Sequence, residues 1–196
     1  MKALIKFGQV VSVALALISS SSSLADTFNL DPGHSSVIFR VVHMGISPIY
    51  GSFNTVSGAV DADTQGNLHG VRVSITAASV NTNNSRRDGT LIGPNFFNTQ
   101  QFHTLTFVSS SVQRISDTEF DVTGAFTMLG TTRTITVRAI RTGLVLIPAA
   151  DGNPEQLHIG SETKFKIRRS EFGMSAMPDG IGDEIEVIVA ADSVKI

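Results

Sequence analysis

Apolar and polar side chains alternate with a period of two along most of this chain, and that pattern restricts the fold more than any other feature. The clearest run, Leu157 to Arg169, places apolar or small residues at every second position and mostly charged residues between them. Successive side chains of a strand point to opposite faces, so the run predicts an antiparallel strand with one buried and one solvated face. Similar runs occupy residues 35–43, 71–77, 120–128 and 135–139.

Turn-forming residues separate these runs at intervals short enough for hairpin connections. Examples are Asp31-Pro32-Gly33, Gln65-Gly66-Asn67 and Asp151-Gly152-Asn153-Pro154. We count about eight strands, several of them ten or more residues long and hence over roughly 30 Å in length. No linker, composition shift or internal repeat divides the chain. We therefore predict an all-β fold in one domain, an elongated eight-stranded antiparallel barrel.

Residues 1–25 are typical of a secretory signal peptide. Two lysines precede the apolar run Val10–Ile18, which is far shorter than the roughly 20 residues needed to span a bilayer. Ser23 and Ala25 are small residues at the positions that signal peptidase reads. We expect export with cleavage after Ala25, leaving residues 26–196 as the barrel domain; an uncleaved anchor or a core helix is the alternative.

Charge and composition exclude several function classes. The chain has 15 basic and 17 acidic residues, and cleavage would remove Lys2 and Lys6 but no acidic residue, so the mature chain is net acidic. No basic block remains to follow a phosphate backbone, so we expect no nucleic-acid binding. The absence of cysteine excludes disulfides and a thiol nucleophile. A membrane-spanning barrel would need aromatic girdles, whereas this chain has no Trp and one Tyr, so we expect no membrane insertion.

Aromatic side chains concentrate on the predicted inner face, where they either fill the barrel or line a cavity. An eight-stranded barrel is just wide enough either to be filled by its own side chains or to hold one small ligand. Small residues on the same faces, such as Ala77, Gly124 and Ser161, leave volume that the rings do not fill and favour a cavity. The candidate cavity residues are Phe39, Val41, Phe53, Phe96, Phe97, Phe107, Phe126, Met128, Phe165 and Phe172.

A short, helix-compatible insert between Arg86 and Phe107 interrupts the strand pattern, and we place it at the mouth of the barrel. Phe96 and Phe97 follow Pro94, a residue favoured at the first position of a one- or two-turn helix. One ring would then close the core while the other gates the cavity.

Polar residues of the same insert are candidates for binding the head group of an apolar ligand. They are Arg86, Arg87, Asp88 and His103. A guanidinium offers paired donors to phosphate, carbonyl or amide oxygens. The alternative is structural, with Ser85 capping the turn and Arg87 paired with an acid to hold the insert in place.

Four segments, in order, resemble successive blocks of the YceI-like family of bacterial periplasmic, lipocalin-like proteins. They read DPGHSSVIFRVVHMGISPIYGSFNTVSG, ASVNTNNSRRDGTLIGPNFFNTQQFHTLTF, GAFTMLGTTRTITV and FKIRRSEFGM. The resemblance covers essentially all of residues 26–196. It implies a periplasmic, elongated lipocalin-like barrel, with a short helical insert at its mouth, that holds a long polyisoprenoid or another long-chain amphiphile such as an isoprenoid quinone or fatty amide.

Individual positions fit the family pattern, with two departures near the predicted mouth. The fitting positions are His34-Ser35, Phe39, His43, Arg87-Asp88, Phe96-Phe97, Phe107 and Arg169 with Phe172-Gly173. Thr90 stands where members usually have His, and His103 stands where they usually have Pro after the Phe that follows the insert. Because both departures lie near the mouth, we expect them to affect which ligand head group is preferred and to leave the tail-binding core unchanged.

The sequence shows no catalytic or metal-binding pattern. No GxSxG motif occurs, and Asp183 and Glu184 would point to opposite faces of a strand. His34 and His43 would lie about 30 Å apart along an extended strand, so they could not share one ion. We expect a binding or carrier protein with no catalytic residues, no metal and no cofactor other than a bound isoprenoid lipid or quinone. An enzyme acting on such a lipid and a ligand-free envelope-stress interaction module are the alternatives, and the sequence leaves a homodimer open.

Overall fold

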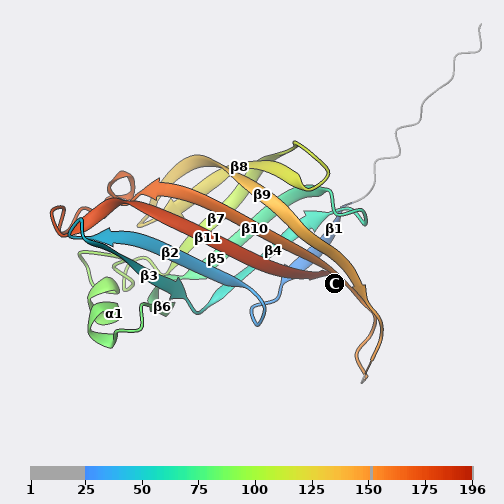
Figure 1. Ribbon diagram of the computed structural model, residues 1–196, viewed down its shortest axis with the longest axis horizontal. Helices are drawn as coiled ribbons and strands as arrows, with labels where there is room; N and C mark the ends of the chain where they lie inside the picture. Colours follow the sequence, from blue (N-terminus) through green and yellow to red (C-terminus); the bar gives the residue numbers. More distant parts are fainter. Residues whose placement is uncertain (1–24, 151, 196) are drawn as a thin grey trace, which may run out of the picture.

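The computed structural model describes residues 25–150 and 152–195, which form an elongated barrel with a short helix at one end (Figure 1). Residues 1–24, which hold nearly all of the expected signal peptide, lie outside that description. Within the described part of the chain, no helix has the length and apolar character needed to cross a membrane.

Eight strand positions close the barrel, and three of them are interrupted strands, because β6 also continues β5. β1 and β2 both pair with β11 and together occupy one strand position. β4 pairs with β1 and β3 pairs with β2, so these two strands together occupy the next position. The β1–β11 pairing completes the ring, and the predicted eight-stranded antiparallel barrel is confirmed. The described strands are β1 (Asp26–Leu30), β2 (Ser36–His43), β3 (Ser47–Phe53), β4 (Val56–Ala62), β5 (Leu68–Thr76), β6 (Val80–Asn81), β7 (Thr104–Arg114), β8 (Glu119–Met128), β9 (Thr131–Ile147), β10 (Gln156–Arg168) and β11 (Ile181–Lys195).

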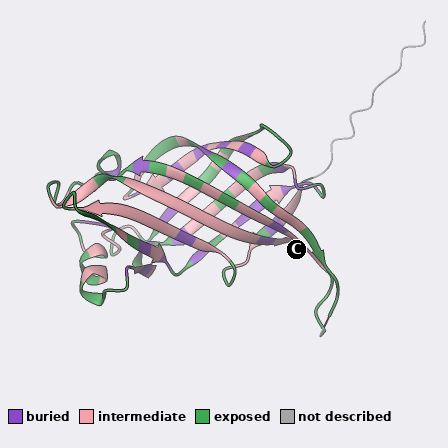
Figure 2. Ribbon diagram, in the orientation of Figure 1, coloured by how far each residue is buried: buried purple, intermediate pink, exposed green. Residues whose placement is uncertain are grey.

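The period-two pattern sorts side chains to the two faces of the wall as expected. Along β8, every second residue from Phe120 to Met128 is buried, and Figure 2 shows buried residues recurring along the strands. On the outer face, Lys166 of β10 pairs with Glu184 of β11 at 2.7 Å. Burial of the apolar face supplies most of the stabilisation of such a wall, because exposed ion pairs contribute little.

Apolar side chains fill the end of the barrel that lies away from the helix. Phe28, Phe120, Val122 and Ile159 are each at most 1% exposed. These side chains belong to one packed cluster, so this end has a filled core.

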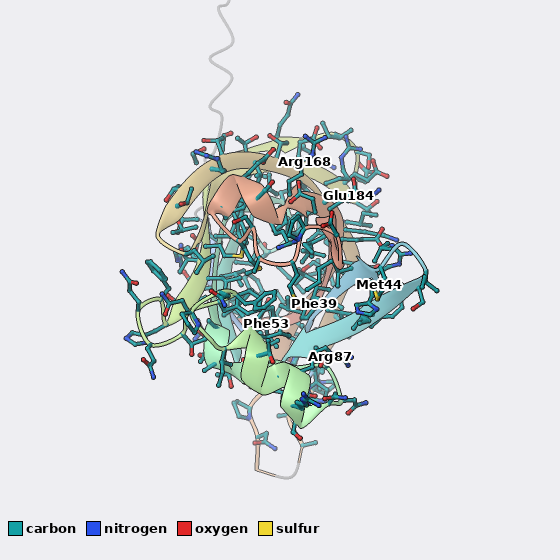
Figure 3. All side chains as sticks on the ribbon, turned by 90° about the vertical axis from the view of Figure 1, so that its left-hand side faces the viewer. Phe39, Met44, Phe53, Arg87, Arg168 and Glu184 are labelled. Carbon is teal, nitrogen blue, oxygen red and sulfur yellow. The ribbon has the colours of Figure 1, made fainter. Side chains whose placement is uncertain are left out.

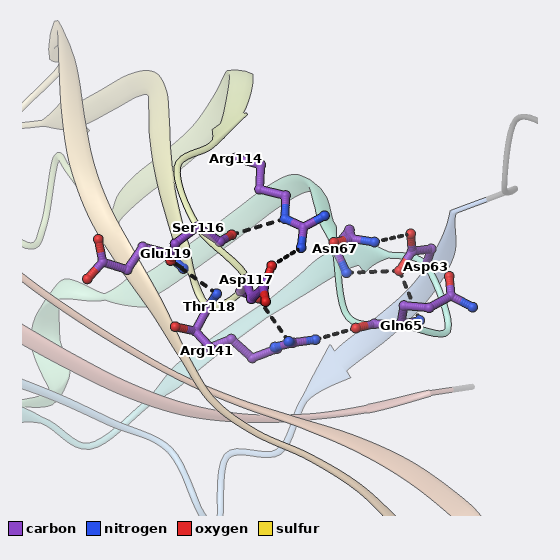
Figure 4. Close-up of polar contacts among 9 residues, drawn as sticks. All are labelled: Asp63, Gln65, Asn67, Arg114, Ser116, Asp117, Thr118, Glu119 and Arg141. Carbon is purple, nitrogen blue, oxygen red and sulfur yellow. Dashed lines mark hydrogen bonds and ion pairs between the residues drawn. The ribbon is translucent and has the colours of Figure 1, made fainter. Parts of the chain in front are cut away.

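Polar contacts tie together the loops outside that filled end (Figure 4). The Asp63 carboxylate accepts hydrogen bonds from the backbone N–H groups of Gln65 and Asn67, both at 2.9 Å. The Arg141 guanidinium donates to the backbone carbonyls of Gln65 and Asp117. This network joins the β4–β5 and β7–β8 turns to β9.

The hydrogen-bonded wall is incomplete at the opposite end, which we call the mouth. There β6 pairs with β3 through only two residues, Ser52 and Phe53. Among the described residues, 47–51 of β3 have no strand partner on that side. Helix α1 (Ser85–Leu91) and the segment after it lie at this end of the barrel and cover the gap (Figure 1). The helical insert therefore completes a wall that the sheet leaves open.

The helix begins earlier in the insert than the sequence analysis predicted. The structural alternative had Ser85 capping a turn here, but the Asn84 side chain is the cap of the helix and accepts a hydrogen bond from a backbone N–H of the first turn at 3.0 Å. Asn is as good an N-cap as Ser, so adjacent candidates could not be separated from sequence. The helix expected at Pro94 is also wrong, since the residues after Pro94 form turns.

Candidate functional site

A cavity of about 720 Å³ opens at the mouth of the barrel. Inward-facing residues of β2, β3, β10 and β11 form much of its wall, and α1 with the segment after it forms another side. Figure 3 looks into this end and shows Phe39 and Phe53 inside the ring of strands, with Arg87 on α1 at the edge. The volume lies within the roughly 300–1,000 Å³ typical of small-molecule sites, so the barrel is a container at this end.

Seven of the ten cavity residues predicted from the sequence line this space. They are Phe39, Val41, Phe53, Phe96, Phe97, Phe126 and Met128. Turns rather than a helix after Pro94 bury both Phe96 and Phe97, which are 5% and 9% exposed. The insert thus contributes two adjacent rings to the same wall.

Among the aliphatic side chains of the cavity wall, the sequence prediction named Val41 alone. The aliphatic residues that it missed are Val37, Val42, Ile49, Ile75, Leu91, Leu105, Ile167, Ile181, Ile185 and Val187. The signal was present, because strand alternation places Val37 on the face of Phe39 and Ile167 on the face of Phe165. The cavity wall therefore contains the aliphatic as well as the aromatic residues of the inward-facing strand positions.

A smaller cavity of about 110 Å³ lies deeper in the barrel and is lined by the predicted residues Phe107 and Phe165. Val37 and Ile75 line both cavities, so these two side chains lie on the boundary between them. The interior is therefore a wide outer space, a narrow apolar boundary and a small inner space.

Phe172, also predicted to line the cavity, lies behind its wall. The ring is 1% exposed and packs edge to face on Phe126, with centroids 5.3 Å apart and planes inclined by 84°. It lines neither of the two cavities. Its contact supports the position of the Phe126 ring in the wall.

Arg87 and Asp88 hold α1 through a buried threonine that the sequence analysis did not identify. Thr82 is 6% exposed and donates from its N–H and its hydroxyl to Asp88 Oδ1, at 2.9 and 2.5 Å. Arg87 donates from Nε to the Thr82 hydroxyl and from Nη2 to the Thr82 carbonyl, both at 2.7 Å. The pair therefore has the role that the structural alternative gave it, although its partner is Thr82 and not an acid.

The other mouth residues divide between the cavity and the outer surface. Arg86 and Arg87 line the cavity, whereas Asp88 and His103 do not. The exposed His103 ring places Nδ1 2.9 Å from the Thr99 carbonyl oxygen. Thr90, one of the two departures from the family pattern, lines the cavity.

A buried arginine organises the loop that forms the far side of the mouth. Arg169 is 3% exposed and lines the cavity. Four of its five N–H groups donate to backbone carbonyls, those of Met174, Ala176, Ile181 and Gly182, at 2.8 to 3.0 Å. Carbonyl dipoles therefore compensate the buried charge, and the same bonds fix the course of the loop.

All charged or titratable side chains in the cavity wall are basic. They are His43, Arg86, Arg87 and Arg169. Among the described residues, no Asp or Glu lines this cavity. The interior field is therefore complementary to oxygen atoms that carry negative or partial negative charge.

One group of side chains outside the cavity has the composition of a metal site. Potential ligand atoms of Asp31, His34 and Asp192 lie within 4.8 Å of one another, in the gap between β1 and β2. This group was not predicted, because Asp192 is far from the other two residues along the chain. Its members are already partnered, because His34 Nδ1 lies 2.7 Å from Asp31 and Asp192 accepts from His158 at 2.9 Å. The hydrogen bond to Asp31 raises the pKa of His34.

The geometry defines a class of protein, the antiparallel barrel with an apolar cavity open at one end, and the comparisons place the chain within it. The YceI-like domain matches residues 28–192, and the chain belongs to that family. Protein YceI of Escherichia coli O157:H7 is 30% identical over 188 residues, which are 94% of this chain and 95% of that protein. The predicted family resemblance is confirmed.

Solved structures show the same fold. The YceI protein of Campylobacter jejuni has a TM-score of 0.68 and 26% identity, over 77% of this chain and 87% of that chain. BcnA of Burkholderia cenocepacia has a TM-score of 0.69 and 20% identity, over 83% and 98%. A polyisoprenoid binding domain from Saccharophagus degradans has a TM-score of 0.61 and 14% identity, over 86% and 98%. At these identities, the last two show the fold alone.

Proposed function

We propose that this protein is a periplasmic binding protein that holds one long-chain apolar molecule in its barrel without changing it chemically. The observation that carries the proposal is the 720 Å³ cavity, walled by apolar side chains and open at one end. Polyisoprenoids, isoprenoid quinones and fatty amides share the shape and polarity that such a space accepts. The polyisoprenoid binding domain of Saccharophagus degradans supports the choice, and the signal-peptide pattern supports the compartment.

The cavity volume sets the length of chain that fits. If a methylene occupies roughly 30 Å³, the share of one water molecule in the liquid, 720 Å³ accepts about 24 carbons. At about 0.8 kcal/mol per buried CH₂, their burial contributes about 19 kcal/mol gross. Association and ordering cost about 4–15 kcal/mol, so useful affinity remains without a single polar contact.

Basic side chains at the mouth select the polar end of the ligand. Arg87 keeps its Nη1 group without a hydrogen-bond partner among the described residues, and it lines the cavity beside Arg86. A carbonyl, amide or phosphate oxygen would accept hydrogen bonds there. Asp88 contributes by holding Thr82, and hence α1, and not by contacting the ligand.

The composition of the wall favours binding over catalysis. An enzyme acting on such a lipid would use a proton-transferring group that a second side chain orients near the head group. Within the described part of the wall, His43 is the one imidazole, and no carboxylate or thiol accompanies it. The remaining alternative, a filled interaction module, predicts a residual volume of a few tens of Å³, far below the volume found.

Native mass spectrometry on protein purified from its own host without detergent tests the proposal. We expect a stoichiometric bound mass that solvent extraction identifies as a prenyl, quinone or fatty-amide molecule. A protein that is empty when isolated and stays empty after incubation with prenyl lipids would contradict the proposal.

Adjacent residues of β11 provide a matched control for the same experiment. Val187 lines the cavity, whereas Ile188 is paired with Lys164 and Ile38 on the outer face. Val187→Trp should displace the bound molecule because the indole occupies its space, and Ile188→Trp should leave it bound. Equal occupancy in both variants would place the ligand outside this cavity.

A further inference from the structure

Three large apolar side chains are exposed together beside the mouth. Met44 and Ile46 lie in the β2–β3 turn and are 59% and 81% exposed, and Met177 lies in the β10–β11 connection and is 56% exposed. The two turns are joined, since Met44 N–H donates to the carbonyl of Gly180 at 2.8 Å. We call Met44, Ile46 and Met177 the apolar rim; Figure 3 shows Met44 at the perimeter of this end.

The apolar rim is continuous with the cavity. Met177 is more than half exposed to solvent and also lines the cavity. A molecule that leaves the cavity along this side therefore meets apolar side chains as far as the outer surface. Exposed apolar groups that form a patch around a binding site mark a surface that contacts another apolar phase.

The backbone conformation at Met44 and Met177 is one that methionine adopts only at an energetic cost. Met44 and Met177 both have φ of +52°, in the left-handed region where Gly or Asn is the favourable residue. Glycine holds the same conformation elsewhere, at Gly45 beside Met44 and at Gly66 and Gly152 of the filled end. Each methionine thus carries a conformational cost as well as the cost of exposure, a combination found where a residue serves a function.

Uncharged segments adjoin the apolar rim, although Glu171 and Asp179 are exposed in the β10–β11 connection. Four segments at the mouth contain no charged residue: 44–49, 91–99, 127–132 and 173–178. The turns at the filled end instead carry Asp63, Arg114, Asp117 and Glu119 (Figure 4). The filled end also exposes Val145, Leu146 and Ile147, but these side chains line neither cavity. Among the described residues, the apolar rim is therefore the exposed apolar surface that is continuous with the wide cavity.

We propose that the apolar rim docks on the surface of a lipid bilayer, so that the ligand passes between the cavity and the membrane without crossing water. This inference rests on the proposed function, because a chain of about two dozen carbons leaves for water too slowly to be exchanged by simple dissociation. Contact of the rim with lipid supplies a continuous apolar path. The uncharged segments fit a neutral, zwitterionic surface and do not require anionic lipid.

A tryptophan reporter tests docking without any ligand. The chain has no Trp, so Ile46→Trp gives a single fluorophore at the rim, and Ile147→Trp gives one at the filled end, where Ile147 is 47% exposed. Neutral phosphatidylcholine vesicles should shift the emission of the first variant to the blue and leave the second unchanged. The shift should persist at high salt because no charge is involved. An unshifted Ile46→Trp spectrum would overturn the proposal, as would equal shifts in both variants.

A second pair of substitutions separates docking from folding. Met44→Asn and Met177→Asn together keep residues that tolerate left-handed φ, so Tm should stay the same or rise. Transfer of a fluorescently labelled geranylgeranyl lipid from protein to vesicles should slow by roughly tenfold or more, since two apolar side chains no longer enter the lipid. For the unsubstituted protein, the transfer rate should rise with vesicle concentration.

The outcomes of the two proposals are distinguishable. A transfer rate that is independent of vesicle concentration, or unchanged by the two Asn substitutions, would contradict docking while leaving lipid binding intact. Failure to bind the geranylgeranyl probe would count against the proposed function, and the tryptophan experiment would still decide whether the rim meets a bilayer. Transfer that occurs only after another protein is added would assign the rim to a protein partner and overturn the bilayer proposal.

Discussion

Phe53 and Phe97 pack edge to face, with ring centroids 5.4 Å apart and ring planes inclined by 74°. Phe53 ends β3, next to the residues that have no strand partner on one side, and Phe97 belongs to the insert that covers the gap. The contact between these rings therefore joins the sheet to the insert where backbone hydrogen bonds do not.

Replacing Phe97 by alanine should open this junction. The side chain is 9% exposed, so we expect the free energy of unfolding to fall by about 3 kcal/mol, the low end for loss of a buried ring. Urea unfolding measures the change, and amide exchange should accelerate in β3 and α1 before other elements. Ile140→Ala, on an outward residue that is 42% exposed, is the control. Equal effects of the two substitutions would show that the ring does not hold the junction.

Phe165→Ala should lengthen the chain that the barrel accepts. Phe165 lines the inner cavity of about 110 Å³ and packs edge to face on Phe126 at 6.5 Å, beside the boundary between the two cavities. Its removal should join the cavities and admit at least one more isoprene unit, measured by native mass spectrometry with a series of prenyl alcohols. Because the ring borders empty space, the loss of stability should be less than about 3 kcal/mol.

Phe172→Ala provides the contrast to that variant. Phe172 is buried against Phe126 and lines neither cavity. We expect a loss of roughly 3–5 kcal/mol and no change in the preferred chain length. A change in chain preference in this variant, or none in Phe165→Ala, would contradict the assignment of the two rings.

Arg169→Met should destabilise the mouth loop by about 3 kcal/mol or more. The substitution removes the donor to four backbone carbonyls, and unpaired buried carbonyls are costly. Chemical denaturation measures the loss. Arg169→Lys keeps the charge but has three donors, so it should recover only part of the stability. Arg168→Met, which alters the exposed neighbour, should have little effect, and equal losses at both positions would contradict the assigned role.

Stability should depend on pH through the contact of His34 with Asp31. The hydrogen bond raises the pKa of His34 above 6.5, so its contribution is complete below pH 6.5 and is lost as the pH rises through the raised value. The same bond lowers the pKa of Asp31 below 3.8, so its contribution is present above pH 3.8 and is lost in stronger acid. The difference in Tm between the protein and His34→Gln should therefore be largest between pH 3.8 and 6.5 at low salt. A difference that does not vary between pH 5.5 and 8.5 would contradict the pairing.

Periodicity made the barrel predictable, and local chemistry made the mouth harder to predict. Strand faces such as that of β8 follow directly from alternation, because a one-residue shift would expose the whole apolar set. The helix position did not follow, because Pro94 is favoured at a first helical position but lies in a turn, and nothing local distinguishes Asn84 as a cap from Ser85. Alternation also places His158 on the outer surface, yet its side chain is 15% exposed and bonded to Asp192. A partner so distant along the chain leaves no local signal.

The anchors of the candidate site were also beyond sequence reasoning. Thr82 looks like any polar residue after a strand, and only the fold shows that it is buried and bound by both Arg87 and Asp88. Arg169 fitted the family pattern, but its four carbonyl partners are brought together by the loop that it stabilises. Such contacts depend on the tertiary structure, so a reading of neighbouring residues does not reveal them.

The two-residue ladder between β6 and β3 has a mechanical consequence. At the filled end, backbone ladders run around the whole circumference of the barrel. Hydrogen-bond geometry therefore fixes the diameter of the barrel there. At the mouth, one arc of the circumference consists of side-chain contacts, which slide and repack at less cost than a ladder breaks. Stiffness therefore falls from one end of the barrel to the other, and the compliant end can widen for a bulky head or a branched chain while the stiff end preserves the fold.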